Sequence, residues 1–271
     1  MKKIAVVNDI SGFGRCSLTA ALPVISSFGV QCCPLVTGVY SNQTGYDSYK
    51  RVDLTDSMQG FIDEWKKLGA RFDAIITGFV TSAEQGKIIG GFIDDFGKNA
   101  IVAVDPVMAD DGEVYDGFDE KRIASVVALV KKADIITPNL HELCIIAGRE
   151  YKADYSDGDI LEMSKKTGVN TVITTGIKRA DCVKTAVFSG GKFETVTRQK
   201  CGESFSGTGD ILVSYVTAAL VSGDNVFTAT KKACSFIEQA IRLTVAENGE
   251  TPYRAEGVYF EKLLDLKGPL V

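Results

Sequence analysis

The stretch from Gly202 to Asp210 combines glycines, hydroxyl groups and one carboxylate in a way that suits phosphate chemistry. It reads Gly-Glu-Ser-Phe-Ser-Gly-Thr-Gly-Asp and continues into an apolar segment, 211–216, that is typical of a buried helix. Three glycines within eight positions free the backbone to expose consecutive N–H groups. The helix start would add unpaired N–H donors and the positive end of its dipole. The pattern therefore predicts an anion site.

Asp210 lies at this site, where a phosphate would also be favoured. Phosphoryl transfer accounts for the combination: the amides and the dipole hold the developing charge, while Asp210 takes a proton from the attacking hydroxyl. An ordinary aspartate in the first turn of a glycine-fronted helix accounts for it equally well. The motif alone leaves both interpretations open.

Three other polar loops follow predicted strands. Residues 8–17 contain Ser11 and a Gly-Phe-Gly turn that lacks the third glycine of a dinucleotide fingerprint; a small polar substrate or a plain turn fits it better. Residues 40–46 are rich in hydrogen-bonding groups, and their two tyrosines could stack on a flat heterocycle, although a polar surface loop is the simpler alternative. Residues 105–112 crowd three carboxylates, which favours a balancing cation or a metal-bound phosphate: Asp105, Asp110 and Asp111.

The segment 137–142 has two compatible interpretations. Asn139 and Glu142 have the spacing of a helix capping box, and the same carboxylate can hold magnesium waters. His141 is the single histidine of the chain, which excludes a histidine pair or a His-based zinc site. No GxSxG elbow precedes it to build a Ser-His-Asp triad. We expect His141 to be an exposed helix residue.

The composition is that of a soluble globular protein, with 271 residues, 45% hydrophobic and 24% charged. A net charge of −5 argues against a general nucleic-acid or anionic-membrane surface. No apolar run approaches membrane-spanning length, and we do not expect the first residues to act as a signal peptide. The seven cysteines show no CxxC spacing with histidine partners, so we expect reduced, mostly buried thiols in a cytoplasmic protein.

The elements that must position these loops alternate along the chain. Strands are expected at 4–7, 30–36, 74–77, 101–104, 135–137 and 171–174, and helices near 17–28, 55–68, 83–96, 120–131 and 159–166. This alternation predicts an α/β fold with a mostly parallel sheet covered on both faces. The runs 183–189 and 192–197 flank two glycines and predict an antiparallel edge hairpin, and helices 210–221 and 226–247 close the fold.

The chain has no linker, low-complexity stretch or internal repeat, so residues 1–271 are expected to form a single domain. In open parallel sheets, ligands bind at the carboxyl ends of the strands. The polar loops above fall at those ends.

Taken in order, these motifs resemble the pyridoxal kinase branch of the ribokinase-like superfamily over essentially the whole chain. The segments that carry the resemblance are the N-terminal loop with Ser11, Ser41–Tyr46, Thr77–Phe79 with Ser82–Gln85, Asp105–Met108, Thr137–Glu142 and Gly207–Asp210. The resemblance implies a three-layer α/β/α fold and ATP-dependent phosphorylation of the 5′-hydroxymethyl group of a vitamin B6 vitamer (pyridoxal, pyridoxine or pyridoxamine). It also implies a cytoplasmic homodimer.

The same resemblance assigns roles to residues. Asp210 would be the general base, and the anion hole would be formed by Gly207, Thr208 and Gly209. The substrate ring would contact Ser11, Gln43, Thr44, Tyr46 and Phe79. ATP would contact Asp105, Asn139, Glu142, Thr174, Thr175 and Thr208. Magnesium would be held, partly through water, by Glu142 and Asp105, and a monovalent cation (K⁺ or Na⁺) by Asp110, Thr137 and Thr174.

Two departures leave the preferred vitamer open: Phe79 replaces a common tyrosine and Gln43 a common histidine. A hydroxymethylpyrimidine kinase is the main alternative, although such enzymes usually carry a Gly-Gly-rich N-terminal loop and lack a stretch like 42–46. A non-catalytic B6- or nucleotide-binding protein is a further alternative, against which the intact Gly207–Asp210 motif argues.

Overall fold

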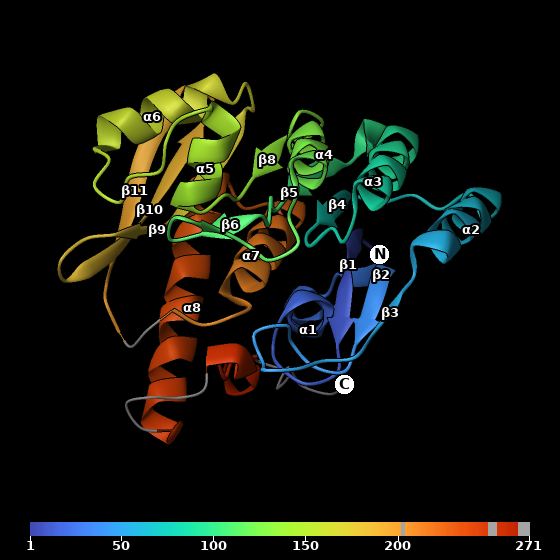
Figure 1. Cartoon of the computed structure of the whole chain (residues 1–271), viewed down its shortest axis with the longest axis horizontal. Coiled ribbons are helices and arrows are strands. Elements are labelled where there is room, and N and C mark those ends of the chain that lie inside the picture. Colours follow the sequence, from blue (N-terminus) through green and yellow to red (C-terminus); the bar gives the residue numbers. More distant parts are fainter. Residues whose placement is uncertain (202–203, 249–253, 265–271) are drawn as a thin grey trace.

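The computed structural model describes residues 1–201, 204–248 and 254–264. Within these residues, a nine-stranded sheet has the order β11-β10-β9-β8-β5-β4-β1-β2-β3 (Figure 1). Its strands are β1 (Lys3–Ser11), β2 (Gln31–Tyr40), β3 (Arg51–Asp53), β4 (Ala74–Thr77), β5 (Ile101–Val104), β8 (Ile135–Ile136), β9 (Thr171–Lys178), β10 (Cys182–Ser189) and β11 (Lys192–Gln199). A separate two-stranded hairpin consists of β6 (Ala109–Asp110) and β7 (Glu113–Val114).

The central six strands are parallel, while β10 and β11 at one edge and β3 at the other are antiparallel to their neighbours. The expected parallel sheet and edge hairpin are thus confirmed. Three short strands, β3, β6 and β7, were not expected from the sequence. They have two or three residues each, too few to produce a visible alternation of apolar and polar side chains.

Eight helices connect and cover the strands in the described part of the chain. They are α1 (Ser17–Ser27), α2 (Thr55–Lys67), α3 (Ala83–Phe96), α4 (Glu120–Val130), α5 (Leu140–Ala147), α6 (Asp157–Lys166), α7 (Thr208–Val221) and α8 (Val226–Asn248). The three short 3₁₀ turns are Gly97–Asn99, Arg254–Glu256 and Glu261–Leu263. None of the described helices is long and apolar enough to cross a bilayer.

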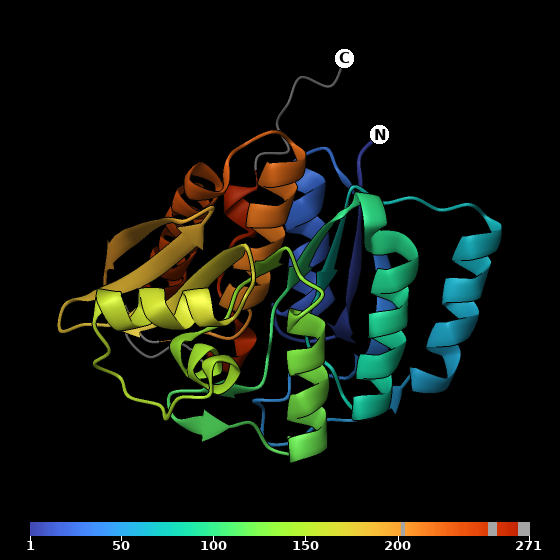
Figure 2. The same cartoon turned by 90° about the horizontal axis from the view of Figure 1, so that it is seen from above.

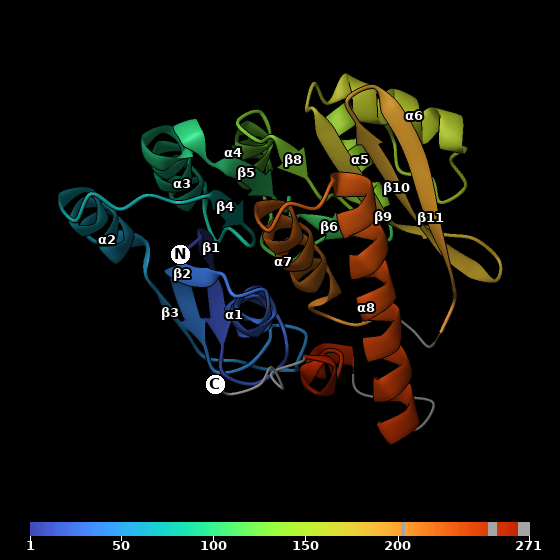
Figure 3. The same ribbon diagram turned by 180° about the vertical axis from the view of Figure 1, so that it is seen from behind.

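The helices form two layers around the sheet. The helices α2 to α6 pack on one face, and α1, α7 and α8 on the other (Figures 2 and 3). Strand β1 shows why: Ala5 and Val7 join the first core cluster, whereas Ile4 and Val6 join the second, because successive side chains point to opposite faces. The expected three-layer α/β/α fold is confirmed.

The bounds of several elements matter for the site. β4, β5 and α3 have the bounds expected from the sequence, but β1 extends to Ser11, which therefore lies in a strand rather than in a loop. The pairing of β1 with β2 shifts register between Asn8 and Ile10. Such irregularities bend a strand locally and redirect its side chains. This one lies near the carboxyl end of β1.

All seven cysteines are free thiols; Cys16, Cys144 and Cys234 are buried and the others half-buried. The expectation of reduced thiols is consistent with this arrangement. Burial raises the pKa of Cys16 and Cys32 to about 12, so these two thiols are poor nucleophiles.

Candidate active site

The glycine-rich loop leads into α7 as the sequence predicts. Gly207 is the N-cap residue and has φ 80°, in the left-handed region. A Cβ at this position would stand 1.9 Å from the carbonyl oxygen of Arg15, so a side chain cannot be accommodated. The Thr208 hydroxyl donates to the carbonyl of Phe205 at 3.1 Å. Gly202 and Glu203, the start of the motif, lie outside the described residues.

Asp210 lies in the first turn of α7 and is contacted by residues from β1 and α1. The amide of Asn8 donates to its Oδ1 at 3.0 Å, and the Ser17 backbone N–H faces the same carboxylate. Burial raises the pKa of Asp210 to about 6; the charge of Asp9 raises it further, and the contacts from Ser17 and Asn8 lower it. A carboxylate with a pKa near 6 suits a general base at neutral pH.

Asn8 also joins two strand ends. Its Oδ1 accepts the backbone N–H groups of Asp9 at 3.0 Å and Phe79 at 3.1 Å. A Cβ on Gly78 would stand 2.4 Å from its side-chain nitrogen, so the residue after β4 must be glycine. The sequence did not point to Asn8. Its position as a polar residue in an apolar strand was the available signal.

Asp105 follows β5 and lies against the glycine-rich loop. Its Oδ2 is 3.4 Å from where a Cβ on Gly209 would stand, and its Oδ1 accepts the Thr137 hydroxyl at 2.8 Å. Burial, and then the charge of Asp210, raise the pKa of Asp105 to about 7, while the Thr137 bond lowers it. The structure therefore brings Asp105, which follows β5, close to Asp210 in the first turn of α7.

Glu142 forms the predicted capping box at the start of α5. Its Oε2 accepts the Asn139 backbone N–H at 2.8 Å, and the Asn139 side chain accepts the Glu142 N–H at 2.9 Å. Its other oxygen accepts the N–H of Met108 at 3.0 Å, which ties α5 to the loop after β5. Burial and the charge of Asp105 raise the pKa of Glu142 well above its ordinary value.

Three carboxylates thus converge on one region: Asp210, Asp105 and Glu142. Buried like charges disfavour one another, and a cation nearby would reverse that effect. Among the residues that the structure describes, no three His, Cys, Asp or Glu side chains are grouped so as to hold a metal ion by themselves. The oxygen donors fit a magnesium ion that takes its remaining ligands from phosphate and water.

Of the other carboxylates of segment 105–112, Asp110 stays in the neighbourhood of Asp105, since burial and the charges of Glu142, Asp110 and Asp105 all raise the pKa of Tyr115. Asp111 forms an ion pair with Lys178 of β9. Asp110 lies in β6, where burial and the charge of Asp111 raise its pKa. Asp111 lies in the β6–β7 turn with a positive φ of 46°. Its ion pair with Lys178 removes it from the expected group of three carboxylates.

Two of the threonines assigned to phosphate or cation binding, Thr174 and Thr175, lie in the middle of β9. Thr174 is fully buried, and its hydroxyl has no hydrogen-bond partner within the described chain. The Thr175 N–H donates to Pro138 at 2.9 Å, and a bridge links Thr175 to Asn139. These contacts place both threonines beside the capping box of α5.

The prediction for His141 was wrong, because its side chain is buried with 8% exposure. Its Nδ1 accepts the Gly112 N–H at 3.2 Å, and its ring centroid lies 4.7 Å from that of Tyr151. The unexpected β6–β7 turn folds over α5 and covers the ring. His141 thus supports the turn rather than facing solvent.

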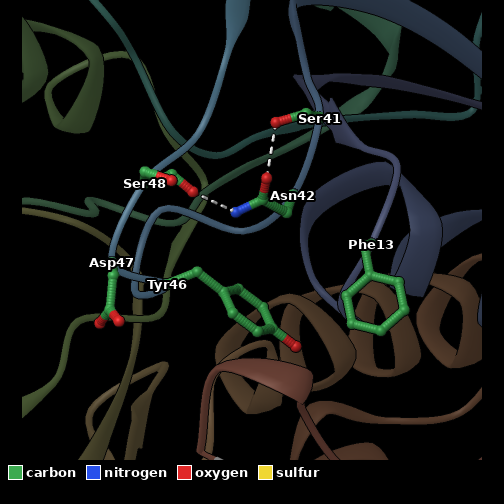
Figure 4. A pocket seen from close by; sticks show the side chains of 6 residues that line it. All are labelled: Phe13, Ser41, Asn42, Tyr46, Asp47 and Ser48. Atoms are coloured by element: carbon green, nitrogen blue, oxygen red, sulfur yellow. Dashed lines mark hydrogen bonds between the residues drawn. The ribbon is translucent and has the colours of Figure 1, made fainter.

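The residues assigned to the substrate ring are divided between several places. Of these residues, Tyr46 lines a hollow of about 380 Å³, together with Phe13, Ser41, Asn42, Asp47 and Ser48 (Figure 4). Phe13, which sequence reasoning missed, meets Tyr46 edge-on with ring centroids 5.8 Å apart. The side-chain amide of Asn42 accepts from Ser41 at 2.6 Å and donates to the Ser48 carbonyl at 2.8 Å, which shapes the loop (Figure 4).

The other residues assigned to the substrate ring do not line that hollow. Ser11 is 2% exposed, and its hydroxyl donates to Asp9 at 3.1 Å. Phe79 packs against Phe118, and the guanidinium of Arg122 lies 4.9 Å from its ring centroid. The two other predicted residues lie on the 41–48 loop: Gln43, whose side chain accepts the Gly45 N–H, and Thr44, which is exposed.

Comparisons with known proteins identify the family of the chain. The family model described as phosphomethylpyrimidine kinase matches residues 14–253. The chain is similar to a Bacteroides thetaiotaomicron protein, provisionally named a phosphomethylpyrimidine kinase and crystallised with pyridoxal, with 40% identity, a TM-score of 0.90 and coverage of 97% of this chain and 94% of that one.

Two pyridoxal kinases are also similar. The structure from Lactobacillus plantarum shares 26% identity and a TM-score of 0.89, covering 97% of this chain and 95% of that one. A pyridoxine/pyridoxal/pyridoxamine kinase of Bordetella avium is 26% identical over 253 residues, 88% of this chain and 84% of its own length. The chain therefore belongs to the phosphomethylpyrimidine kinase family, and its α/β fold is the one found in pyridoxal kinases of the ribokinase-like superfamily.

Proposed function

We propose that the protein transfers the γ-phosphoryl group of ATP to the 5′-hydroxyl of a vitamin B6 vitamer. The observation that carries this proposal is the position of Asp210. It lies beside Asp105, in the first turn of α7, and Gly207 precedes that helix. A base there can take the hydroxyl proton while the N–H groups of the helix start hold the transferred phosphoryl group.

The other site residues have supporting roles in this proposal. Asn8 and the Ser17 N–H hold the base, and Gly207, which has no Cβ, lets the start of α7 pack against the Arg15 carbonyl in the loop before α1. Magnesium bound between Asp105, Glu142 and the phosphates would neutralise charge that develops during transfer. We further propose K⁺ or Na⁺ beside Asp110, Thr137 and Thr174. The buried Thr174 hydroxyl, unpartnered within the described residues, supports a ligand there.

B6 vitamers are the favoured substrates because the similar Bacteroides thetaiotaomicron protein was crystallised with pyridoxal. The aromatic pair Phe13 and Tyr46 offers apolar surface for a flat ring. Hydroxymethylpyrimidine is the second candidate, since the matching family is described as phosphomethylpyrimidine kinase. Both substrates present a primary hydroxymethyl group on a flat heterocycle, so Asp210 would act in the same way.

A substrate panel with magnesium and ATP tests the proposal. We expect pyridoxal, pyridoxine and pyridoxamine to exceed hydroxymethylpyrimidine in kcat/KM, and all four to exceed ribose. A tenfold preference for ribose or adenosine, about 1.4 kcal/mol in transition-state stabilisation, would refute the assignment. We also propose that the protein is a cytoplasmic homodimer. A measurement of its size in solution tests whether it is a dimer.

A further inference from the structure

Asp9 is a buried carboxylate that the proposed reaction does not use. Its side chain is 5% exposed, and its oxygens accept the hydroxyls of Ser17 at 2.7 Å and Ser11 at 3.1 Å. Burial raises the pKa of Asp9, and the two hydroxyls lower it. Since burying a carboxylate is costly, its contacts with the neighbouring residues call for an explanation.

Ser17 is the second part of the arrangement. It begins α1 with φ 48°, one of two non-glycine residues with positive φ in the described ranges. A residue with a Cβ is strained in this left-handed region and stays there only when its surroundings hold it. The short bond from its hydroxyl to Asp9 supplies that hold.

The strained conformation has a direct consequence for Asp210. The backbone N–H of Ser17 faces the Asp210 carboxylate, on which Asn8 also donates a hydrogen bond. Asn8 and Asp9 are adjacent in β1, and in a regular strand their side chains would point to opposite faces. The register shift between Asn8 and Ile10 allows both to act on the same region.

We propose that Asp9 is a positioning residue for Asp210: it holds Ser17 in the left-handed conformation, and Ser17 then directs its N–H at the base. The N–H of Ser17 and the amide of Asn8 together hold the Asp210 carboxylate in line with the attacking hydroxyl. The inference rests on the proposed function, because it assumes that Asp210 is the base. Asp9 itself need not touch the substrate.

Two substitutions of Ser17 separate this role from simple packing. Ser17→Ala removes the hydroxyl but keeps the Cβ, so the backbone should leave the left-handed region. Ser17→Gly also removes the hydroxyl, yet glycine adopts that region without strain and keeps the N–H. We expect kcat to fall about 10- to 100-fold in Ser17→Ala, with KM for both substrates within about twofold. Ser17→Gly should recover most of that loss.

A double-mutant cycle then tests whether Asp9 acts through Ser17. Asp9→Ala should lower kcat about as much as Ser17→Ala in the wild-type background, but by only about threefold in the Ser17→Gly background. Ser164→Ala is the matched control, since it removes a buried hydroxyl that bonds to Ile160 in α6, on the other face of the sheet. It should leave kcat and KM unchanged. Asp9→Asn replaces Asp9→Ala if the latter does not fold.

Crystal structures of the two Ser17 variants give a result that does not depend on turnover. Asp210 should keep its bond to Asn8 and its orientation in Ser17→Gly and lose that orientation in Ser17→Ala. Equal kcat values in Ser17→Ala and Ser17→Gly, or an equal cost of Asp9→Ala in both backgrounds, would overturn the inference. A wild-type protein that phosphorylates none of the panel substrates would instead refute the proposed function, and the crystal structures would then decide the role of Asp9.

Discussion

At the scale of single residues, the site assigns different tasks to carboxylates that look alike in the sequence. Asp210 and Asp105 have pKa values of about 6 and about 7, both above 3.8, because they are buried near one another. Asp111, only six positions from Asp105, pairs with Lys178 and belongs to a different part of the surface. Environment, not residue type, therefore distinguishes the base from its neighbours.

Replacing Asp210 with Asn should abolish most turnover while leaving substrate binding intact. The side chain keeps its size and its contact with Asn8 but loses the ability to take a proton. A positioned general base contributes about 10²–10⁴-fold in rate, and kcat should fall by that factor. Dissociation constants for ATP and pyridoxal, measured by calorimetry, should change little. Near-normal kcat in a folded Asp210→Asn protein would exclude Asp210 as the base, and Asp224→Asn, at a peripheral ion pair with Lys232, is the control.

Glu142→Gln should show whether that carboxylate acts on magnesium as well as on the backbone. Its two oxygens each accept a backbone N–H, from Asn139 and Met108, and glutamine can satisfy only one of these donors. Some loss of stability is therefore expected from either role. If Glu142 also acts on magnesium, the Glu142→Gln variant should need a higher magnesium concentration than wild type for half-maximal activity. If the activity of the variant, plotted against magnesium concentration and scaled to the same maximum, superimposes on the wild-type curve, Glu142 acts only as a helix cap.

At the scale of elements, the sequence predicted those parts of the site that depend on local signals. The capping box at Asn139 and the glycine-fronted start of α7 follow from spacing, and apolar runs with clear ends defined β4, β5 and α3. The contact of Asn8 with Asp210 joins residues 202 positions apart, which no local pattern reveals. The burial of His141 depended in the same way on the β6–β7 turn, which is too short to predict.

Arg15 links three segments: the loop before α1, the start of α7 and residues 254–264. Its guanidinium bonds to Glu261 at 2.6 Å and Glu256 at 3.4 Å, and lies 4.3 Å from the ring centroid of Tyr259. Its carbonyl oxygen contacts the backbone at Gly207. The segment 254–264 is thereby attached to the loop before α1 and to the start of α7.

Arg15→Ala should loosen this attachment. Partly exposed ion pairs contribute about 0–1 kcal/mol each and a cation–π contact about 0.5–1 kcal/mol, so we expect a loss of about 1–2 kcal/mol in unfolding free energy. Hydrogen exchange should increase in residues 254–264 more than in the sheet. The control is Arg242→Ala, at an exposed pair with Glu238 on α8, which should cost less because solvent screens that pair. Unchanged exchange in 254–264 would show that Arg15 does not brace the segment.

At the scale of the whole molecule, one sheet carries every part of the site. The strands β1, β4, β5, β8 and β9 end at the same edge, and α1, α5 and α7 begin there. We propose that residues 1–271 form a single domain, because nine of the eleven described strands belong to this sheet. The carboxylates at that edge are then held together by the fold, and their repulsion is a cost to the stability of the unliganded protein.

This cost predicts how stability depends on pH. The pKa values of Asp105 and Asp210 in the folded state, about 7 and about 6, exceed the ordinary value of 3.8, so the folded protein binds more protons than the unfolded chain between these values. The stability that these two groups contribute is fully present below about pH 4 and is lost as the pH rises through 6 and 7. Thermal unfolding of the unliganded protein at pH 5.5 to 8.5 should therefore show a melting temperature that falls as the pH rises.

Asp105→Asn isolates the main part of that effect. The asparagine can still accept the Thr137 hydroxyl, but it carries no charge at any pH. We expect this variant to melt at a higher temperature than wild type at pH 8.5, where each 1 kcal/mol corresponds to about 2–4 °C for a protein of this size, and to exceed wild type by a smaller margin at pH 5.5. Turnover should fall at the same time, because the carboxylate proposed to hold magnesium is lost. A variant that is destabilised equally at both pH values would show that the Asp105 charge is already balanced in the unliganded protein, and that the three carboxylates do not require a cation.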